Sequence, residues 1–197
     1  ESSAASDVYK RQSPLGETIV AAHQIAMSVT SQLFMIPMSL AIALTIRVGT
    51  YYGEKNWEAM RKVQKLGLAT GTVLALMTML LIALFRPEIV AIYTSDHEVS
   101  EVAMYLLLFA LAYQLMDAWQ ISAAGCLRGM QDTKGPMWIT MVAYWIVAFP
   151  VSIYLARYTN IGAAGVWIGL IVGLSVACAL LLLRLYNNNK RLSQDYP

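Results

Sequence analysis

Long stretches without a charged residue constrain the fold of this chain more than any other feature of its sequence. Four such stretches, each lacking Asp, Glu, Lys and Arg, occupy residues 18–46, 66–85, 135–156 and 158–183. A fifth apolar stretch, 102–127, contains a single acid, Asp117. About 20 apolar residues in an α-helix cross the hydrocarbon of a bilayer, and a helix satisfies its own backbone hydrogen bonds, which lipid cannot do. The pattern therefore predicts an all-α polytopic membrane protein with five transmembrane helices.

The composition agrees with a membrane location and excludes a soluble bundle. Hydrophobic residues make up 58% of the chain and charged residues 13%, and this charged share is about half of that in soluble domains. A soluble five-helix bundle needs a charged outer face on each helix, which these stretches do not provide. The predicted helices span residues 18–49, 58–85, 98–127, 135–156 and 161–186.

The predicted membrane domain, residues 17–187, is flanked by two polar segments. Residues 1–16, ESSAASDVYKRQSPLG, lack the charged start and apolar core of a signal peptide, so we expect a disordered tail. Residues 188–197 form a second polar tail. Within the membrane domain, Pro37 and Pro150 are expected to kink their helices, and Arg86-Pro87 is expected to end the second helix. A stripe of small residues for close helix packing is predicted in the last helix, at Gly165, Gly169, Gly173 and Ala177.

Basic residues are distributed unevenly between the two ends of the predicted helices. Apart from the N-terminal tail, one end contains only Arg86 and Arg157. The opposite end contains ten Lys and Arg residues, namely Arg47, Lys55, Arg61, Lys62, Lys65, Arg128, Lys134, Arg184, Lys190 and Arg191. Because loops rich in Lys and Arg stay in the cytoplasm, the C-terminal tail is predicted to be cytoplasmic. These basic residues flank membrane segments, so no nucleic-acid surface is predicted.

The acid in the third helix is the candidate functional group. At a rise of about 1.5 Å per residue, Asp117 lies about 16 Å from the level of Arg128 and about 24 Å from that of Glu101, near the middle of a hydrocarbon layer about 30 Å thick. Tyr113, Asp117 and Gln120 share one helix face. Carboxylate, ring face and amide oxygen each attract positive charge, so the three side chains predict a cation site. The alternative is a structural acid that is hydrogen-bonded to a neighbouring helix.

The other chemically active side chains indicate no catalytic centre. Cys126 and Cys178 lie in apolar helices without a ligand at metal-site spacing, which is typical of packing residues. His23 is either a proton relay or a polar residue satisfied near the interface, and Tyr144 and Trp145 either line a cavity or face lipid. No HExxH, GxSxG or GxxxxGK[ST] pattern occurs. We therefore predict neither an enzyme nor a nucleotide or other cofactor site.

Several motifs occur in a characteristic order. The chain contains PLGETIVAAHQIA, then FMIPMSLAIALTIRVG, then YQLMDAWQISAAGCLRGMQDT, and a YW pair with a later proline in the fourth predicted helix. Together they resemble the MATE (multidrug and toxic compound extrusion) family, in its NorM-like bacterial branch, over residues 13–186. Family members have twelve helices in two six-helix lobes around a cavity that opens to each side of the membrane in turn. This chain resembles helices eight to twelve, five of the six helices of the C-terminal lobe.

The resemblance implies a function that composition and spacing alone do not. It implies a secondary-active efflux antiporter of the bacterial inner membrane, which exports amphipathic, often cationic drugs or dyes in exchange for Na⁺ or H⁺. In the NorM-like branch an acid of the seventh helix and a YxxxD motif of the tenth form the cation site. The motif is present here as Tyr113 and Asp117, which makes Asp117 a candidate Na⁺ ligand. The acid partner and the N-terminal lobe are not in this sequence, so we expect an incomplete piece of a transporter.

Two alternatives to the antiporter interpretation remain. A lipid-linked oligosaccharide flippase of the same superfamily shape is expected to place Arg or Lys in its cavity for a pyrophosphate, and none lies between the predicted helix ends. The second alternative is a membrane enzyme or a non-transporting structural subunit. Polar groups clustered around Asp117 would favour the enzyme, and an Asp117 sealed by one hydrogen bond would favour the structural subunit.

Overall fold

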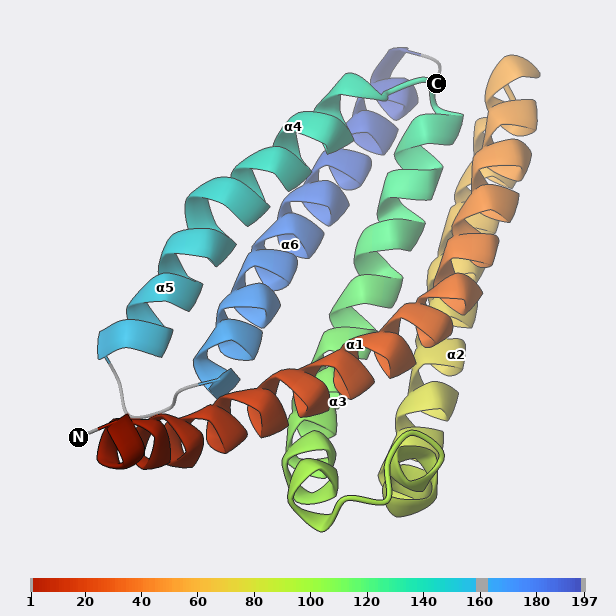
Figure 1. The fold of residues 1–197 in the computed structure, drawn as a ribbon. Coiled ribbons are helices and arrows are strands. Elements are labelled where there is room, and N and C mark those ends of the chain that lie inside the picture. Colours follow the sequence, from red (N-terminus) through yellow and green to blue (C-terminus); the bar gives the residue numbers. More distant parts are fainter. Residues whose placement is uncertain (1, 159–162, 196–197) are drawn as a thin grey trace.

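The computed structural model describes the backbone of residues 2–158 and 163–195. Apart from short turns, these residues are helical (Figure 1). The segments α4, η1 and α5 follow one another without a break as one rod, so the described residues contain five helices long and apolar enough to cross a membrane. The elements in chain order are α1 (Ser2–Gly53), α2 (Trp57–Ala91), α3 (His97–Gly129), α4 (Lys134–Val142), the π-helix η1 (Ala143–Ala148), α5 (Phe149–Tyr158) and α6 (Ala163–Asp195).

The third helix, α3, is the centre of the bundle. It packs against α1, α2 and α6, and Figure 1 shows it between α6 on one side and the α1–α2 pair on the other. Two apolar clusters hold it in place. One contains Leu107 of α3 and Trp167 of α6, and the other contains Leu127 of α3 and Leu181 of α6. No buried residue of α3 between positions 111 and 122 belongs to either cluster.

The outer surface of the bundle is strongly apolar at membrane depth. On α2, the side chains of Met77, Leu80 and Leu84 are 63%, 59% and 63% exposed. On η1, Trp145 and Ile146 are 70% and 67% exposed. Continuous exposure of large apolar side chains on this scale is typical of a surface covered by lipid. Trp145 therefore lies on the outer surface of the described helices.

Glycines allow two pairs of helices to touch through their backbones. A Cβ atom added to Gly125 of α3 would lie 2.6 Å from the carbonyl oxygen of Ala41 in α1. The same glycine's carbonyl oxygen accepts a hydrogen bond from Thr45 Oγ1 at 3.1 Å. A Cβ atom added to Gly173 of α6 would lie 3.0 Å from the carbonyl oxygen of Ala143, so the close packing predicted for the small residues of the last helix is confirmed at this position.

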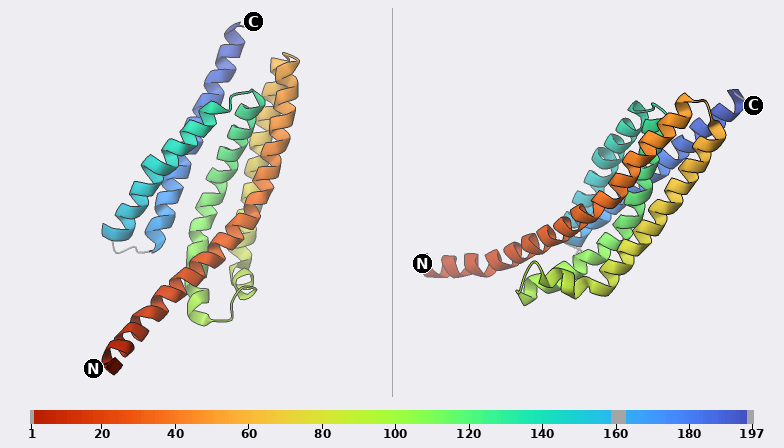
Figure 2. Two further views of the ribbon diagram at one scale, coloured as in Figure 1. Left: turned by 45° about the horizontal axis from the view of Figure 1, so that its top comes forward. Right: turned by 90° about the vertical axis from the view of Figure 1, so that its right-hand side faces the viewer.

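Prolines affect the three helices that contain them differently. α1 continues through Pro37 as one helix, and Figure 2 shows it curving along its length. The second helix is interrupted where Arg86-Pro87 was expected to end it. Phe85 leaves helical geometry (φ −113°, ψ 22°) and forms a kink, after which α2 resumes and runs on to Ala91. Upstream of Pro150 the chain forms η1, whose wider turn accommodates a proline that has no N–H to donate.

Most helix ends lie further out than the predicted bounds; the predicted start of the last helix, at 161, lies outside the described residues. The first predicted helix, 18–49, corresponds to α1, which begins at Ser2, so the backbone of residues 2–16 continues this helix where we expected a separate tail. At the other end of the chain, α6 extends to Asp195, through most of the predicted tail at 188–197. A helix satisfies its own backbone groups in water as well as in lipid. The loss of hydrophobicity therefore marks the membrane surface and not the end of the helix.

A polar clamp connects the α3–α4 turn to α6. Arg184 donates from Nε to Asp132 Oδ2 at 2.6 Å and from Nη2 to Oδ1 at 3.0 Å. Asn188 Nδ2 donates to the same Oδ2 at 3.1 Å, and the backbone N–H of Gly135 donates to Oδ1 at 3.2 Å. The hydrogen bond from Arg184 is the main reason that the pKa of Asp132 lies below its usual range.

The contact at Gly125 predicts a sharp intolerance of larger side chains. We expect Gly125→Val to lower the free energy of unfolding by about 1–3 kcal/mol, because the new methyl groups would push α1 and α3 apart. Gly53→Val is the matched control, since Gly53 has no atom within 4 Å of an added Cβ atom. Denaturant unfolding in detergent micelles measures both variants. Equal stability of the two would contradict the close α1–α3 contact.

The clamp predicts a loss of stability in acid. Because the pKa of Asp132 is lowered in the folded protein, the clamp contributes fully above the unfolded pKa of about 3.9 and is lost as the pH falls through the lower folded value. We therefore expect Asp132→Asn to melt at a lower temperature than the unaltered protein near neutral pH. The difference should disappear as the pH falls below about 4. A difference that stays constant with pH would exclude this role.

Candidate functional site

Four buried polar side chains form a band on α3 between the two apolar clusters. Gln114, Asp117, Gln120 and Ser122 are 2%, 4%, 8% and 0% exposed. They interrupt an otherwise apolar interior at the depth where polar groups are hardest to accommodate. Such groups are expected to have a partner within the protein or a ligand to bind. The partners of each group therefore decide what the band can do.

Asp117 is buried, and the described residues offer it no hydrogen bond. Its Oδ2 is inaccessible to solvent and makes no hydrogen bond within the described residues. Among these same residues Asp117 also takes part in no ion pair. A buried carboxylate without a counter-charge costs several kcal/mol, so the group favours binding a proton or a small cation. A structural acid sealed by a hydrogen bond from a neighbouring helix, one of our two interpretations, receives no support from these contacts.

Two tyrosines lie close to this carboxyl group. Tyr113 of α3 and Tyr144 of η1 both interact electrostatically with Asp117. Tyr144 Oη donates to Gln120 Oε1 at 3.2 Å, which connects η1 to the band on α3. The structure therefore brings the three predicted residues, Tyr113, Asp117 and Gln120, together on one side of α3 and adds Tyr144 opposite them. This side of the bundle thus offers the Asp117 carboxylate, the Tyr144 hydroxyl group and the Gln120 amide oxygen, and oxygen atoms are the ligands that a hard cation such as Na⁺ prefers.

Three residues of this region were not predicted to belong to the site. The sequence alone does not decide whether Tyr144 lines a cavity or faces lipid. Its one distinguishing feature is its place six residues before Pro150, in a helix that this proline can distort. It lies in the π-helix η1, and short π-helical segments occur frequently at functional sites. Gln114 and Ser122 were missed altogether. The only signal for them was their polarity within an apolar stretch. Gln114 lies three residues from Asp117 and shares its side of the helix, whereas Ser122 faces Gly71 of α2.

A groove adjoins Tyr144, and its lining includes no residue of α3. It has a volume of about 390 Å³ and is lined by Tyr144, Ala148, Phe149 and Ser152 from the η1–α5 rod and by Val166 and Leu170 of α6. Tyr144 thus donates a hydrogen bond from its hydroxyl group to Gln120 and also lines this mainly apolar groove. An amphipathic organic molecule in this groove would lie one residue away from the polar band.

The remaining candidates take structural positions. His23 Nδ1 accepts a hydrogen bond from Trp167 Nε1 at 3.3 Å, and the two rings lie 5.5 Å apart between centroids. This contact supports the interpretation of His23 as a polar residue satisfied within the bundle. Cys126 and Cys178 are buried and free. Among the described residues, no group of three His, Cys, Asp or Glu side chains is placed to hold a metal ion.

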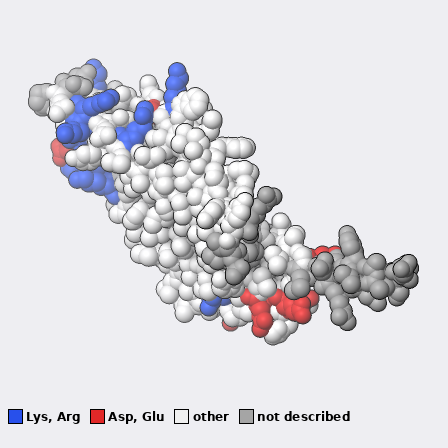
Figure 3. Space-filling model, turned by 90° about the vertical axis from the view of Figure 1, so that its left-hand side faces the viewer, with Lys and Arg blue, Asp and Glu red and all other residues white. Residues whose placement is uncertain are grey.

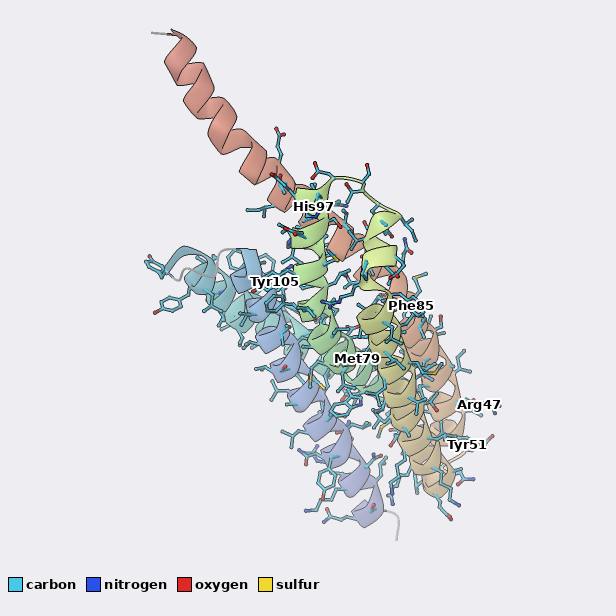
Figure 4. The ribbon with its side chains drawn as sticks, turned by 90° about the horizontal axis from the view of Figure 1, so that it is seen from below. Arg47, Tyr51, Met79, Phe85, His97 and Tyr105 are labelled. Atoms are coloured by element: carbon cyan, nitrogen blue, oxygen red, sulfur yellow. The ribbon has the colours of Figure 1, made fainter. Side chains whose placement is uncertain are left out.

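Charge is segregated along the bundle axis. On the face shown in Figure 3, Lys and Arg side chains gather at one end of the molecule and Asp and Glu side chains gather at the other. Figure 4 places Arg47 and Tyr51 at the end opposite His97. The polar band lies between these ends, about midway along α3, so it is separated from both charged surfaces by an apolar cluster.

Comparison with known proteins gives consistent matches. The model of the MatE family matches residues 12–154. The chain is 75% identical over 183 residues to the probable multidrug resistance protein NorM of Acinetobacter baylyi, covering 93% of this chain and 41% of that protein. It is 44% identical over 179 residues to the multidrug resistance protein NorM of Vibrio cholerae, covering 88% of this chain and 39% of that protein. The chain thus spans about two-fifths of the length of these relatives.

Solved structures show the same fold. An outward-facing multidrug resistance MATE family transporter of the MOP superfamily matches with a TM-score of 0.84 and 20% identity, covering 91% of this chain and 40% of that one. An inward-facing structure of such a transporter matches with a TM-score of 0.77 and 18% identity, covering 87% of this chain and 41% of that one. The arrangement of helices described above therefore occurs in both conformations.

The unpaired carboxylate predicts an unusual gain in stability. We expect Asp117→Asn to raise the free energy of unfolding by about 1–3 kcal/mol at about pH 8 without Na⁺, because it removes a buried charge that has no partner. Unfolding in detergent micelles measures the change. Asp132→Asn, which removes a paired acid, should change stability in the opposite direction. A loss of stability in Asp117→Asn would show that its carboxylate is paired.

Proposed function

The chain belongs to the MatE family, and on this basis we propose that it is part of a multidrug efflux transporter driven by a cation gradient. Na⁺ or H⁺ would enter through Asp117, and an amphipathic, often cationic drug or dye would leave the cell in exchange. The relatives are named for multidrug resistance, which supports transport over the membrane-enzyme alternative. The buried, unpartnered carboxylate of Asp117 is the observation that carries the proposal.

The buried position of Asp117 makes it suitable for coupling. Without a cation its negative charge disfavours any state that closes the surrounding helices over it. Binding of Na⁺ or H⁺ neutralises the carboxylate and removes this penalty. An ion drives a conformational change only through such a difference in affinity between two states. Tyr113 and Gln120 would supply further oxygen atoms to Na⁺, and Tyr144 would hold Gln120 in place through its hydrogen bond.

The drug is proposed to bind beside the same residues. The groove of about 390 Å³ is lined in part by Tyr144, whose hydroxyl group donates to Gln120, and its walls are mainly apolar. A lipophilic cation in this groove would be attracted by the charged form of Asp117. It would be released when a coupling ion binds and neutralises the carboxylate. The lobe and the preceding helix that complete the cavity in the resembling family would come from sequence outside this chain.

The orientation in the membrane is also a proposal. The end with most Lys and Arg side chains (Figure 3) is proposed to face the cytoplasm, as the positive-inside tendency indicates. On this proposal the C-terminus lies in the cytoplasm, and the membrane is the bacterial inner membrane. The flippase alternative is disfavoured because the polar band contains no Lys or Arg among the described residues. Arg128, the nearest basic residue in chain order, lies 11 residues from Asp117 in the last turn of α3. Arg86 donates to the carbonyl oxygen of Met104 nearer the opposite end.

Drug efflux tests the proposal directly. In cells without other efflux pumps, we expect Asp117→Asn in the full-length protein to reduce gradient-driven efflux of a fluorescent cationic dye at least about fivefold. Glu101→Gln is the matched control, because it removes an exposed acid from the same helix. Expression in the membrane is measured for each variant. Dye efflux at the unaltered rate in Asp117→Asn would remove the coupling role.

A further inference from the structure

A second groove lies at the basic end of the bundle, between α2 and α6. It has a volume of about 420 Å³, and its walls combine the basic residues Arg61, Lys65 and Lys190 with the apolar residues Leu68, Leu182 and Leu185. We propose that this groove binds one anionic phospholipid, with its phosphate among the basic side chains and an acyl chain along the leucines. The proposal requires only that the chain spans a membrane, and it does not depend on the transport function.

The groove is basic at its rim and apolar deeper in the membrane, as a lipid molecule has a polar headgroup and apolar acyl chains. Leu182 precedes Lys190 by eight residues on α6, so the apolar wall lies about 12 Å deeper than the basic rim. Leu68 lies one turn deeper than Lys65 on α2 in the same way. The neighbouring surface is itself lipid-facing, since Leu66 and Leu183 are 68% and 57% exposed. A groove that opens within a belt of exposed leucines suits an acyl chain better than a soluble ligand or a peptide.

The basic rim continues into a wider polar hollow. This hollow has a volume of about 860 Å³ and shares Arg61, Lys65 and Ser193 with the groove. Its other charged residues are Glu54, Lys55, Glu58 and Lys62, and Glu58 accepts an ion pair from Lys62 at 2.7 Å. Among the described residues, Arg61, Lys65 and Lys190 form no ion pair. The combined site therefore has an excess of positive charge at headgroup level, which favours a lipid phosphate.

The arginine of the rim is held in position by α6. Arg61 Nη2 donates to the carbonyl oxygen of Asn189 at 3.3 Å and to Ser193 Oγ. Asn189 Nδ2 in turn donates to Gln64 Oε1 at 2.7 Å, which closes the floor of the groove between the two helices. Arg61 is half-buried, so part of its side chain remains accessible at the rim. A guanidinium that is fixed in place by its neighbours is well suited to a phosphate oxygen.

Lipid binding is tested by native mass spectrometry of the full-length protein in detergent. Dioleoyl phosphatidylglycerol and dioleoyl phosphatidylcholine are the probes, and we expect the anionic lipid to bind more tightly. Lys65→Gln with Lys190→Gln should reduce this preference at least about tenfold, because both side chains lie at the rim. Both residues are exposed, so the double variant keeps the fold. Arg61 is left unaltered because it connects α2 to α6.

The control removes the same charge from the same end of the bundle. Arg128→Gln with Lys134→Gln takes two exposed basic residues from outside the groove, and its lipid preference should be unchanged. Leu182→Asn should weaken the binding of both lipids to the same extent. Equal losses in the two double variants would indicate a diffuse basic surface, and no loss in either would exclude the rim. Displacement of the lipid by an equal concentration of glycerol 3-phosphate would show that only the phosphate is recognised. Each of these three results would overturn the proposal.

Discussion

Asp117 lies inside the bundle with one carboxylate oxygen sealed from solvent and unpaired among the described residues, and the rest of the structure accommodates that position. α3 packs in the centre of the bundle, where its polar band is covered by α1, α2 and α6. Apolar clusters on both sides of the band stabilise the helix that contains it. The free energy that the bundle gains from these clusters offsets the cost of burying an acid at membrane depth.

Lipid explains why much of the fold was predictable from sequence. A hydrocarbon layer requires long apolar helices, so the charge-free stretches and the single acid at 117 determine the number of helices and the burial of the site. The helix ends were not predictable in the same way, because Ser2 and Asp195 belong to polar segments that remain helical. The interruption of α2 beside Arg86-Pro87 was predictable, but the resumption of the helix as far as Ala91 was not, because it depends on a local distortion at Phe85.

The composition of the candidate site was only half visible in the sequence. Tyr113, Asp117 and Gln120 share a helix face, and helical spacing alone groups them. Tyr144 joins them only because η1 sets the rotation of its helix and directs this tyrosine toward Gln120. The rotation of one helix against another depends on tertiary packing, such as the contact of Gly173 with the η1–α5 rod. No pattern within a single helix carries that information.

The central claim is that a small cation reaches and neutralises Asp117. Carbodiimide labelling of this carboxyl group in the reconstituted full-length protein, quantified by mass spectrometry of the peptide that contains it, tests the claim most directly. The reagent reacts with protonated carboxyl groups in apolar surroundings. The account predicts labelling at Asp117 that falls at least about fivefold when Na⁺ is added or when the pH is raised. Absence of labelling, or labelling that neither ion changes, would contradict it.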